Sequence, residues 1–307
     1  MKWKKIKHLF KVEKNSNKMY SHAAAPIPVH IKENIYHIYF SSRDKFNTAR
    51  PFFLVFDIEN MTILETQNKP LIETGGIGNF DEKGIILTDI IFTTEGYKYY
   101  YVGFPRFANL LYSADSGMAV SKNINDSWEK LGKGPIITKS LEEPLFSSVQ
   151  CVIEDNNEFK MWYVSGVKWK KNEKQYKHYY NIRVSTSKDG ITWSKGKVCI
   201  DFKNEFEYAL ARSCVIKDGP GDYKMWYCFR AQKNIDTYRI GYAESFDGIS
   251  WERKDELMQH FDISVGEFDS EMICYPYVFD HKANRYMLYN GNGYGKTGFG
   301  IAKMIKG

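Results

Sequence analysis

The segments FKMWYVSG (residues 159–166) and YKMWYCFR (residues 223–230) decide the fold, because three other segments of the chain repeat their pattern. The other three are YHIYFSS (36–42), YKYYYVG (97–103) and RYMLYNGN (285–292). All five are rich in the residues that favour β-strands, and all five pass through a tyrosine. These tyrosines are Tyr39, Tyr101, Tyr163, Tyr227 and Tyr289, which lie 62, 62, 64 and 62 residues apart. A regular period of this length predicts a repeat architecture.

A second strand-like run precedes each tyrosine by about ten residues and keeps the same period. Its central residues are Val29, Ile91, Val152, Val215 and Val278, which lie 62, 61, 63 and 63 residues apart. Polar or glycine-rich turns such as TEG and KDGPGD separate the two runs, as a hairpin requires. Because a third strand-like run follows, each unit of about 62 residues predicts a small antiparallel sheet.

A sheet of three or four strands cannot bury both of its faces alone, so radial stacking of the units is the natural solution. We therefore predict an all-β fold, a five-bladed β-propeller in a single domain over residues 1–307. The predicted blades span roughly 18–75, 76–138, 139–202, 203–262 and 263–307 together with 1–17. The N-terminal segment from Trp3 to Val12 is expected to supply the outer strand of the last blade and to close the ring. Two stacked β-sandwiches are the alternative, but they predict no five-fold period.

The composition excludes several classes of protein. The chain has 307 residues and a formal net charge of +6, and its hydrophobic content of 43% supports a large core rather than disorder. No run approaches the roughly 18 apolar residues of a membrane helix, and the basic start is not followed by the apolar stretch of a secretory signal. Five cysteines without a CxxC pair indicate reduced thiols and a cytoplasmic location.

The sequence contains no nucleic-acid-binding motif and no HxxH or HExxH spacing, so we expect no nucleic-acid partner, no metal site and no cofactor. In a propeller the first strand of each blade lines the central channel. Functional side chains are therefore expected on five short segments and on the loops that open onto the same face. The segments are residues 22–28, 81–89, 143–150, 207–213 and 269–276.

Several of these stretches carry a resemblance to a known superfamily. FSSRDKFNTAR (40–50), NFDEKG (79–84), EYALARS (207–213) and DSEMICYPYVFD (269–280) resemble the five-bladed glycoside-hydrolase-like propellers, which include arabinanases, invertases and mannoside phosphorylases. The similarity covers essentially the whole chain and is closest to a cytoplasmic branch among bacterial surface-polysaccharide biosynthesis proteins. It implies carboxylates from different blades that converge in the channel as general acid, nucleophile or base. The turns SKDGITW (187–193) and SFDGISW (245–251) resemble the Asp-boxes of propeller sialidases, and we expect a structural role for them.

Cleavage of a glycosidic bond needs a protonated acid on the leaving oxygen and a second carboxylate at the anomeric carbon or on water. The catalytic candidates are Glu271, Glu207, Asp81 and Asp44. Glu271 is the preferred general acid, because partial burial at the entrance of an apolar strand would favour its protonated form. The alternative for each is a solvated turn residue or a partner for an arginine. The superfamily's acid on the first inner strand is absent from Ser21 to Pro26, which weakens the case for ordinary hydrolysis.

The arginines point to an anionic ligand. Guanidinium groups bind carboxylate or phosphate in a bidentate manner, and several of them are expected at the channel or its mouth. Pairing of each arginine with a nearby acid is the alternative. The substrate-binding candidates are Arg43, Arg50, Arg212, Arg230, His22, Asp89, Asp269 and Asn292, with Trp169, Tyr275, Tyr294 and Phe104 as platforms for a sugar ring.

Three functions are consistent with these residues. The first is a glycoside-hydrolase-like enzyme that acts on an anionic or phosphorylated glycan or sugar conjugate. The second is a non-catalytic propeller that binds a glycan or nucleotide sugar in surface-polysaccharide biosynthesis, and the third is a glycoside phosphorylase or transferase. The hypothesis that the protein processes a sugar requires Glu207, Glu271 and Arg212 to meet at the channel axis rather than to lie scattered over the outer wall.

Overall fold

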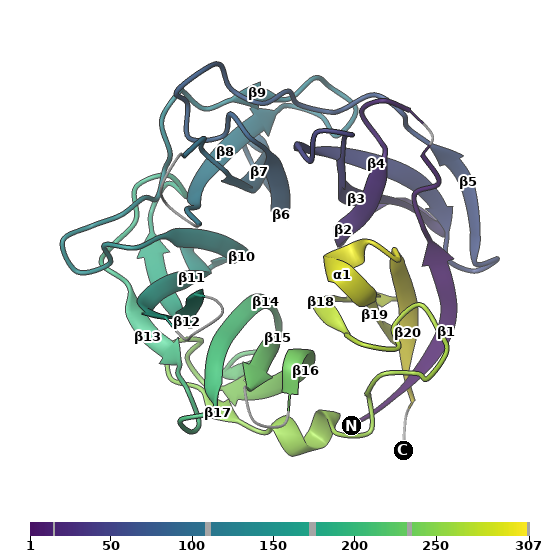
Figure 1. The fold of residues 1–307 in the computed structure, drawn as a ribbon. Helices are drawn as coiled ribbons and strands as arrows, with labels where there is room; N and C mark the ends of the chain where they lie inside the picture. Colours follow the sequence, from purple (N-terminus) through teal and green to yellow (C-terminus); the bar gives the residue numbers. More distant parts are fainter. Residues whose placement is uncertain (15, 108–111, 172–175, 232–234, 306–307) are drawn as a thin grey trace.

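The computed structural model describes residues 1–14, 16–107, 112–171, 176–231 and 235–305. The strands form groups arranged around a central axis, with β2, β6, β10, β14 and β18 nearest the centre (Figure 1). The predicted all-β fold is confirmed. The described helical segments are a short 3-10 turn, η1 (Asp255–Met258), and a single turn, α1 (Asn292–Gly295).

In the first two groups, neighbouring strands follow one another along the chain. The first sheet has the order β2 (Ser21–Lys32), β3 (Ile35–Arg43), β4 (Ala49–Asp57) and β5 (Thr62–Thr66). The second has the order β6 (Ile85–Thr93), β7 (Gly96–Gly103), β8 (Asp115–Ser121) and β9 (Glu129–Lys130). Hairpins therefore build both sheets outward from the axis.

The next two groups are joined. One contains β10 (Ser147–Asp155), β11 (Glu158–Lys171), β12 (Tyr176–Ser187) and β13 (Lys197–Ile200). The other contains β14 (Glu207–Gly219), β15 (Asp222–Ala231), β16 (Ile235–Ser245) and β17 (Glu252–Arg253). A single parallel bridge between Tyr180 and Ala209 connects them into one larger sheet.

The last sheet combines the two ends of the chain. It has the order β18 (Cys274–His281), β19 (Asn284–Asn290), β20 (Phe299–Ile305) and β1 (Lys2–Phe10), and β1 pairs antiparallel with β20. Both termini therefore lie at the outer rim of the same group of strands (Figure 1).

Apolar side chains fill the space between neighbouring sheets. Phe40 and Leu54 of the first sheet form one buried cluster with Leu288 and Ile301 of the last. Similar clusters lie between the other groups and contain the repeated tyrosines that define the sequence period. Burial of apolar surface between neighbouring sheets thus stabilises the packing of the units against one another.

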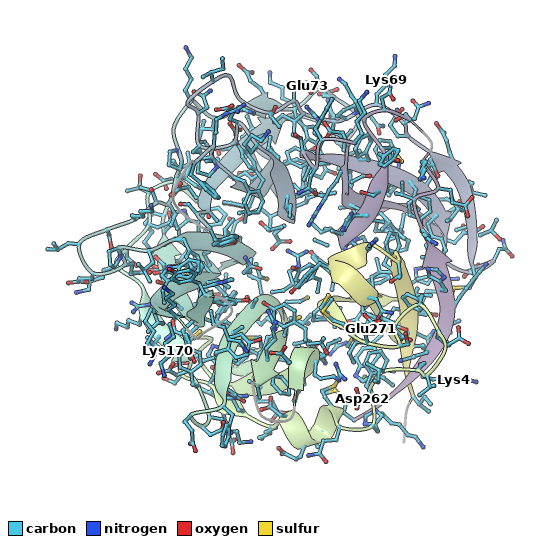
Figure 2. All side chains as sticks on the ribbon, in the orientation of Figure 1. Lys4, Lys69, Glu73, Lys170, Asp262 and Glu271 are labelled. Atoms are coloured by element: carbon cyan, nitrogen blue, oxygen red, sulfur yellow. The ribbon has the colours of Figure 1, made fainter. Side chains whose placement is uncertain are left out.

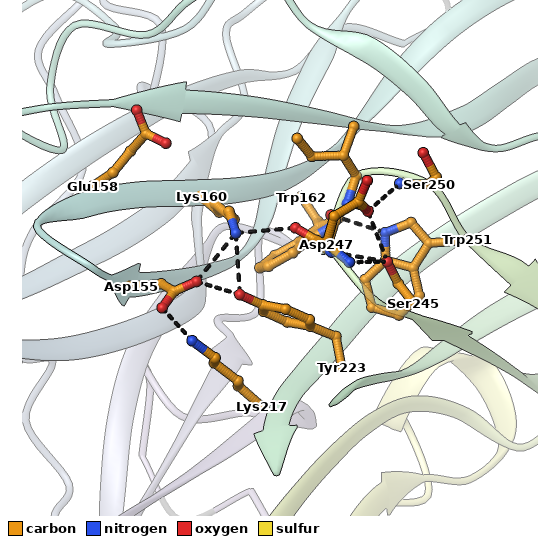
Figure 3. A network of polar contacts seen from close by, with 12 residues as sticks. Asp155, Glu158, Lys160, Trp162, Lys217, Tyr223, Ser245, Asp247, Ser250 and Trp251 are labelled. Atoms are coloured by element: carbon orange, nitrogen blue, oxygen red, sulfur yellow. Dashed lines mark hydrogen bonds and ion pairs between the residues drawn. The ribbon is translucent and has the colours of Figure 1, made fainter. Parts of the chain in front are cut away.

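A polar network joins two neighbouring groups (Figure 3). Lys160 on β11 donates to Asp155 at 3.1 Å, to the hydroxyl of Tyr223 on β15 at 3.1 Å and to the carbonyl of Asp247 at 3.0 Å. The carboxylate of Asp247 accepts the amides of Ile249 and Ser250, both at 2.7 Å. The turn at residues 245–251 therefore ties one sheet to the next.

A buried acid lies 20 residues before the repeated tyrosine in four of the five units. Tyr101 donates to Asp81 at 3.4 Å, Tyr163 to Glu143 at 2.8 Å and Tyr289 to Asp269 at 3.2 Å. The fourth acid is Glu207, which lies 20 residues before Tyr227. Here Tyr227 donates to Asp255 instead, and Arg253 forms ion pairs with both Asp255 and Glu207. We call these contacts the acid latches.

Each acid latch includes a cation from the third or fourth strand of the same group. The pairs are Lys130 with Asp81 at 2.5 Å, Arg183 with Glu143 at 3.5 Å, Arg253 with Glu207 at 2.7 Å and Lys5 with Asp269 at 2.6 Å. The latch therefore connects the entrance of the inner strand to the third or fourth strand of its own sheet. In the first unit the buried Met19 takes the acid's place.

Lys5→Met tests the latch that holds the N-terminal strand. The substitution leaves the carboxylate of Asp269, whose side chain is 1% exposed, without its cation. We expect the free energy of unfolding to fall by about 3 kcal/mol, since removal of one partner strands a buried charge. Lys4→Met is the matched control, because Lys4 is exposed on the same strand, and it should change stability by less than about 0.5 kcal/mol. Urea unfolding measures both, and equal effects would contradict the latch.

Candidate functional site

A pocket of about 320 Å³ opens at the centre of the ring. Its lining includes residues of all five inner strands, such as Ala25 on β2, Thr88 on β6, Gln150 on β10, Arg212 on β14 and Tyr275 on β18. The volume lies at the lower end of the ~300–1,000 Å³ range of small-molecule sites. The repeat thus places one equivalent position from each unit around a single cavity.

A bulge in each inner strand turns these five side chains to the axis. The register shifts where Ala25, Thr88, Gln150, Arg212 and Tyr275 lie, and these positions are 63, 62, 62 and 63 residues apart. Ala25, Arg212 and Tyr275 have φ values of 56°, 53° and 56°, in the left-handed region that costs a non-glycine residue about 1–3 kcal/mol. Strain of this kind concentrates at functional sites.

Three arginines line the pocket, and they differ from all others in the chain. The sequence has nine arginines, and six of them form ion pairs with carboxylates. The six are Arg50, Arg106, Arg183, Arg239, Arg253 and Arg285. The other three, Arg43, Arg212 and Arg230, have no carboxylate partner among the described residues, and all three line the pocket.

Arg212 is the most buried of the three, at 2% exposure. Its Nη1 donates to the carbonyl of Thr88 at 2.6 Å, whereas its Nε and Nη2 have no partner in the described structure. Unsatisfied buried donors cost about 1–3 kcal/mol each, so a guanidinium in this state is prepared for an acceptor that enters the pocket.

Arg230 and Arg43 lie nearer the mouth. The guanidinium of Arg230 is 4.9 Å from the ring of Tyr208 and 5.4 Å from the ring of Tyr238, and its Nε donates to the carbonyl of Asp236 at 2.8 Å. Arg43 donates to Asn47 at 3.0 Å, and burial lowers its pKa. Neutral acceptors thus hold both guanidiniums, two aromatic rings also flank Arg230, and neither arginine forms an ion pair with a carboxylate of the described residues.

The wall between the third and fourth groups of strands is aromatic. The ring of His178 stacks on Tyr112 at 5.2 Å and on Tyr180 at 5.1 Å, and the hydroxyl of Tyr180 contacts that of Tyr238. Burial, together with the charge of Arg230, lowers the pKa of His178 to about 4. His178 is therefore neutral at pH 7 and offers a flat face and one ring donor.

Comparison with known proteins places the chain in a family. It is 35% identical over 306 residues to the Mycobacterium tuberculosis protein MT1551, and 34% identical over 306 residues to Rv1502 from another strain of that species. Each alignment covers 98% of this chain and 99% of the relative. The chain belongs to the Rv1502 family. Neither relative's name states an activity, and no family model matches the chain.

Solved structures share the fold of this Rv1502-family chain. A glycosyl hydrolase from Bacteroides ovatus has a TM-score of 0.73 at 14% identity, over 98% of this chain and 93% of that one. A structure from the mannoside phosphorylase family, which contains hydrolases that target β-1,2 mannosidic linkages in Candida mannan, has a TM-score of 0.68 at 15% identity, with the same coverage. An endo-arabinase from Bacteroides thetaiotaomicron has a TM-score of 0.63 at 11% identity, over 93% and 95% of the two chains. The fold is therefore that of the glycoside-hydrolase-like propellers.

The predicted carboxylates do not converge at this pocket in the Rv1502-family chain. Asp81, Glu207 and Asp269 are the buried acids of the latches, where Lys130, Arg253 and Lys5 neutralise them. Over the ranges that the structure describes, the pocket lining contains no carboxylate. The expected meeting of Glu207, Glu271 and Arg212 at the axis is therefore not seen, since Arg212 alone reaches it.

Asp44 and Arg50 neutralise each other. The two side chains are 2.9 Å apart, and Arg50 also binds Glu73 at 2.9 Å. Burial acts to raise the pKa of Asp44, but hydrogen bonds from Thr48 and Arg50 outweigh it and lower the pKa. The alternative that the sequence left open for Arg50, a nearby acid as its partner, is the one observed.

Glu271 and Asn292 lie on the approach to the pocket. The side chain of Asn292 accepts the amides of Glu271 at 2.8 Å and of Met272 at 3.1 Å, and so fixes the loop before β18. Glu271 is exposed (Figure 2), so the partial burial expected for a general acid is wrong in the present structure. Tyr294, two residues after Asn292, lines the pocket.

Asp89 lies beside the floor of the pocket and is fully buried. Its carboxylate accepts the amide of Val152 at 2.7 Å and the hydroxyl of Tyr277 at 2.9 Å. Burial raises its pKa, although these bonds and the charge of Arg212 oppose the shift. Asp89 thus connects three inner strands and leaves Arg212 without a direct ion pair.

Of the remaining substrate-binding candidates, three line the pocket and two lie beside it. Tyr275, Tyr294 and Phe104 line the pocket, as expected for sugar platforms. Trp169 instead packs behind the wall against His178, with ring centroids 5.0 Å apart. His22 lies next to Arg43 outside the lining, and burial, Arg43 and Lys296 lower its pKa to about 4.

Sequence reasoning missed part of the lining. The residues missed are His178, Tyr180, Tyr112 and Tyr238, whereas Gln150 and Thr88 lie in the segments 143–150 and 81–89, which were expected at the channel, but were not singled out. The equivalent bulge positions carried a usable signal, because Gln150 and Thr88 lie one period from Arg212 and from each other. The aromatic wall carried none, since its tyrosines resemble the many that pack between sheets.

The described residues contain no group of three or more His, Cys, Asp or Glu side chains suited to a metal ion. In the same part of the chain no helix is long and apolar enough to cross a membrane.

Arg212→Met should cost the ligand-free protein far less stability than the loss of a paired arginine. The substitution removes two unsatisfied buried donors, which offsets the loss of the hydrogen bond to Thr88 and of the positive charge near Asp89, so we expect the free energy of unfolding to change by less than about 1 kcal/mol. Arg253→Met is the control, because it leaves Glu207 buried without a cation and should cost about 3–5 kcal/mol. Thermal and urea unfolding measure both. A loss of stability in Arg212→Met comparable with that of the control would contradict our interpretation of Arg212.

Proposed function

We propose that this protein binds an anionic carbohydrate, such as a sugar acid, a sugar phosphate or a nucleotide sugar, in the central pocket. The observation that carries the proposal is the contrast between the chain's arginines. Arg43, Arg212 and Arg230 are the three without a carboxylate partner among the described residues, and all three line one cavity. Guanidinium groups left unpaired in this way select carboxylate or phosphate.

The fold supports a carbohydrate ligand. The similar solved structures include glycoside hydrolases and a mannoside phosphorylase family, so a carbohydrate-active protein is the natural interpretation. The aromatic lining is consistent with it, because a pyranose presents an apolar face that packs on rings such as Tyr275 and Tyr294. We also propose that the chain forms one five-bladed domain over residues 1–307, with β1 as the strand that closes the ring.

The pocket favours binding over hydrolysis by two carboxylates. Such hydrolysis requires a pair of acids flanking the scissile bond. The described lining offers Gln150, Ser148 and Thr88 as neutral polar groups but no acid. The first function that we propose is therefore recognition of the anionic sugar, with its charge on Arg212 and its ring against the aromatic wall.

A second candidate function is phosphate-dependent cleavage or transfer of a glycosyl unit. The arginines favour it, because they could hold inorganic phosphate or a phosphorylated leaving group as well as a substrate anion. Glu271 is the carboxylate that we would assign as general acid in this case. It is exposed and belongs to the loop that Asn292 fixes beside the pocket residue Tyr294.

We further propose a cytoplasmic role in surface-polysaccharide biosynthesis. The five cysteines are unpaired, and four of them are buried, which is the usual state of thiols in a reducing compartment. Nucleotide sugars and sugar phosphates are made in that compartment, so the proposed ligand and the proposed location agree. Nucleic acid is not among the partners that we propose.

Arg212→Ala should separate charged from neutral sugars. We expect wild-type protein to bind glucuronic acid and glucose 1-phosphate more tightly than glucose in calorimetry. Arg212→Ala should weaken binding of the two anions by about 10–100-fold, since a hydrogen bond to a charged group contributes about 1.5–3 kcal/mol. Binding of glucose should stay within about threefold.

Arg285→Ala is the matched control for this experiment. Arg285 is paired with Asp280 at 2.8 Å and with Asp218 at 2.5 Å and lies outside the pocket lining, so its loss should leave all three affinities unchanged. An equal loss for charged and neutral sugars in Arg212→Ala would remove the anion preference from the proposal.

Turnover of chromogenic glycosides distinguishes binding from the second candidate. We expect no release of p-nitrophenol from a panel of p-nitrophenyl glycosides and glycuronides in the absence of phosphate. Release that requires inorganic phosphate and is lost in Glu271→Gln would favour the second candidate. Phosphate-independent release lost in Glu271→Gln would instead favour hydrolysis.

A further inference from the structure

The β11–β12 hairpin is longer than its counterparts. β11 and β12 have 14 and 12 residues, whereas the equivalent β15 and β16 have 10 and 11, β3 and β4 have 9 each, β7 and β8 have 8 and 7, and β19 and β20 have 7 each. The pairing continues outward through Lys168 with Tyr179, Trp169 with His178 and Lys170 with Lys177. The hairpin therefore extends the third group of strands beyond the frame that the other units share.

The two faces of this extension differ. Trp169 and His178 occupy one face, where His178 lines the pocket. The opposite face carries Lys168, Lys170 and Lys177, because successive side chains alternate along a strand. The Nζ atoms of Lys168 and Lys170 are 5.0 and 5.2 Å from the ring centroid of Tyr179. We call Lys168, Lys170 and Lys177 the lysine face.

An aromatic ring connects the lysine face to the pocket. The Nζ of Lys177 is 4.7 Å from the ring centroid of Tyr208, and the guanidinium of Arg230 is 4.9 Å from the same centroid. Tyr179 and Tyr208 are themselves in contact, with centroids 5.9 Å apart. Positive groups and ring faces thus lead from Arg230 in the pocket to Lys170, which lies away from the centre of the ring (Figure 2), and the carboxylate of Asp236 lies beside this path, where it accepts the hydroxyl of Tyr208 at 2.9 Å.

The lysine face holds an excess of positive charge. Lys177 pairs with Asp236 at 3.2 Å, but Lys168 and Lys170 have no carboxylate partner within the described ranges. Lys170 and Lys177 are directly opposite across the hairpin, an arrangement of like charges that destabilises a sheet. An anion bound between the two lysines would relieve this repulsion.

We propose that the lysine face binds the continuation of an anionic oligosaccharide whose terminal sugar occupies the pocket. This inference rests on the proposed function and extends it, because it makes the ligand a charged chain rather than a single sugar. The continuity through Tyr208 favours one ligand for both regions. The rings of Tyr179 and Tyr208 suit the apolar faces of successive sugars, and the lysines suit their repeated charges.

The test compares galacturonic acid with its linear hexamer. We expect wild-type protein to bind the hexamer at least tenfold more tightly than the monomer, with a steeper dependence on salt. The double variant Lys168→Ala/Lys170→Ala should weaken hexamer binding by about tenfold and leave the monomer unchanged. The control is Lys4→Ala/Lys69→Ala, which removes two exposed lysines from other parts of the ring (Figure 2) and should change neither affinity.

Three outcomes would overturn this inference. The first is a hexamer that binds no more tightly than the monomer, and the second is an equal loss in both double variants. The third is tighter binding of a 20-nucleotide RNA or of phosphatidylserine vesicles than of the hexamer, with dependence on Lys168 and Lys170, which would assign the lysine face to another polyanion. Failure of the proposed function looks different. In that case the hexamer would bind through Lys168 and Lys170 with no contribution from Arg212, and the monomer would not bind.

Discussion

The acid latches determine which charges remain for the ligand. Each one connects the entrance of an inner strand to the third or fourth strand of its own sheet through an ion pair between a buried carboxylate and a cation. An acid at that position cannot also serve at the axis, because its charge is already compensated by Lys5, Lys130, Arg183 or Arg253. The inner strands then reach the centre through their bulges, where uncharged side chains and Arg212 meet. Because the latches hold these carboxylates away from the axis, the charged groups of the pocket lining are Arg43, Arg212 and Arg230.

The sequence alone predicted the strands and their order, because the hairpin pattern and the period are local properties. Tyr39 to Tyr289 and Val29 to Val278 lie on the second and first strands of the groups described here. Pocket residues that share the period, such as Arg212 and Tyr275, were also predictable, since a propeller brings equivalent positions to one axis. The positions of the carboxylates could not be predicted in the same way. An acid near the start of an inner strand has the same sequence context whether its side chain faces the axis or contacts the tyrosine that lies 20 residues later. The distinction depends on the bulge, which exchanges the faces of the strand and has no local signature in these segments.

Arg212 shows how the pocket combines a structural cost with a function. Its backbone lies in the left-handed region, its side chain is 2% exposed, and two of its donors have no partner in the described structure. The carboxylate of Asp89, which is fully buried, accepts hydrogen bonds from Val152 and Tyr277 rather than from Arg212. The strained backbone and the unsatisfied donors destabilise the ligand-free protein, and the free donors, with no ion pair to Asp89, favour binding of an anion. The equivalent position of the first unit, Ala25, has no polar side chain and so leaves no side-chain donor unsatisfied.

The units differ from one another at a few positions that do not follow the repeat. Met19 replaces the latch acid in the first unit, where Asp44, Arg50 and Glu73 form an alternative set of ion pairs near the mouth. The third unit lengthens its hairpin and adds lysines to one face and His178 to the other. Features common to all units, such as the inner bulge, shape the cavity, whereas features unique to one unit make its surroundings asymmetric. An asymmetric mouth gives a chain-like ligand one direction in which to leave the pocket, and the shared ring of Tyr208 places that direction over the lysines of the third unit.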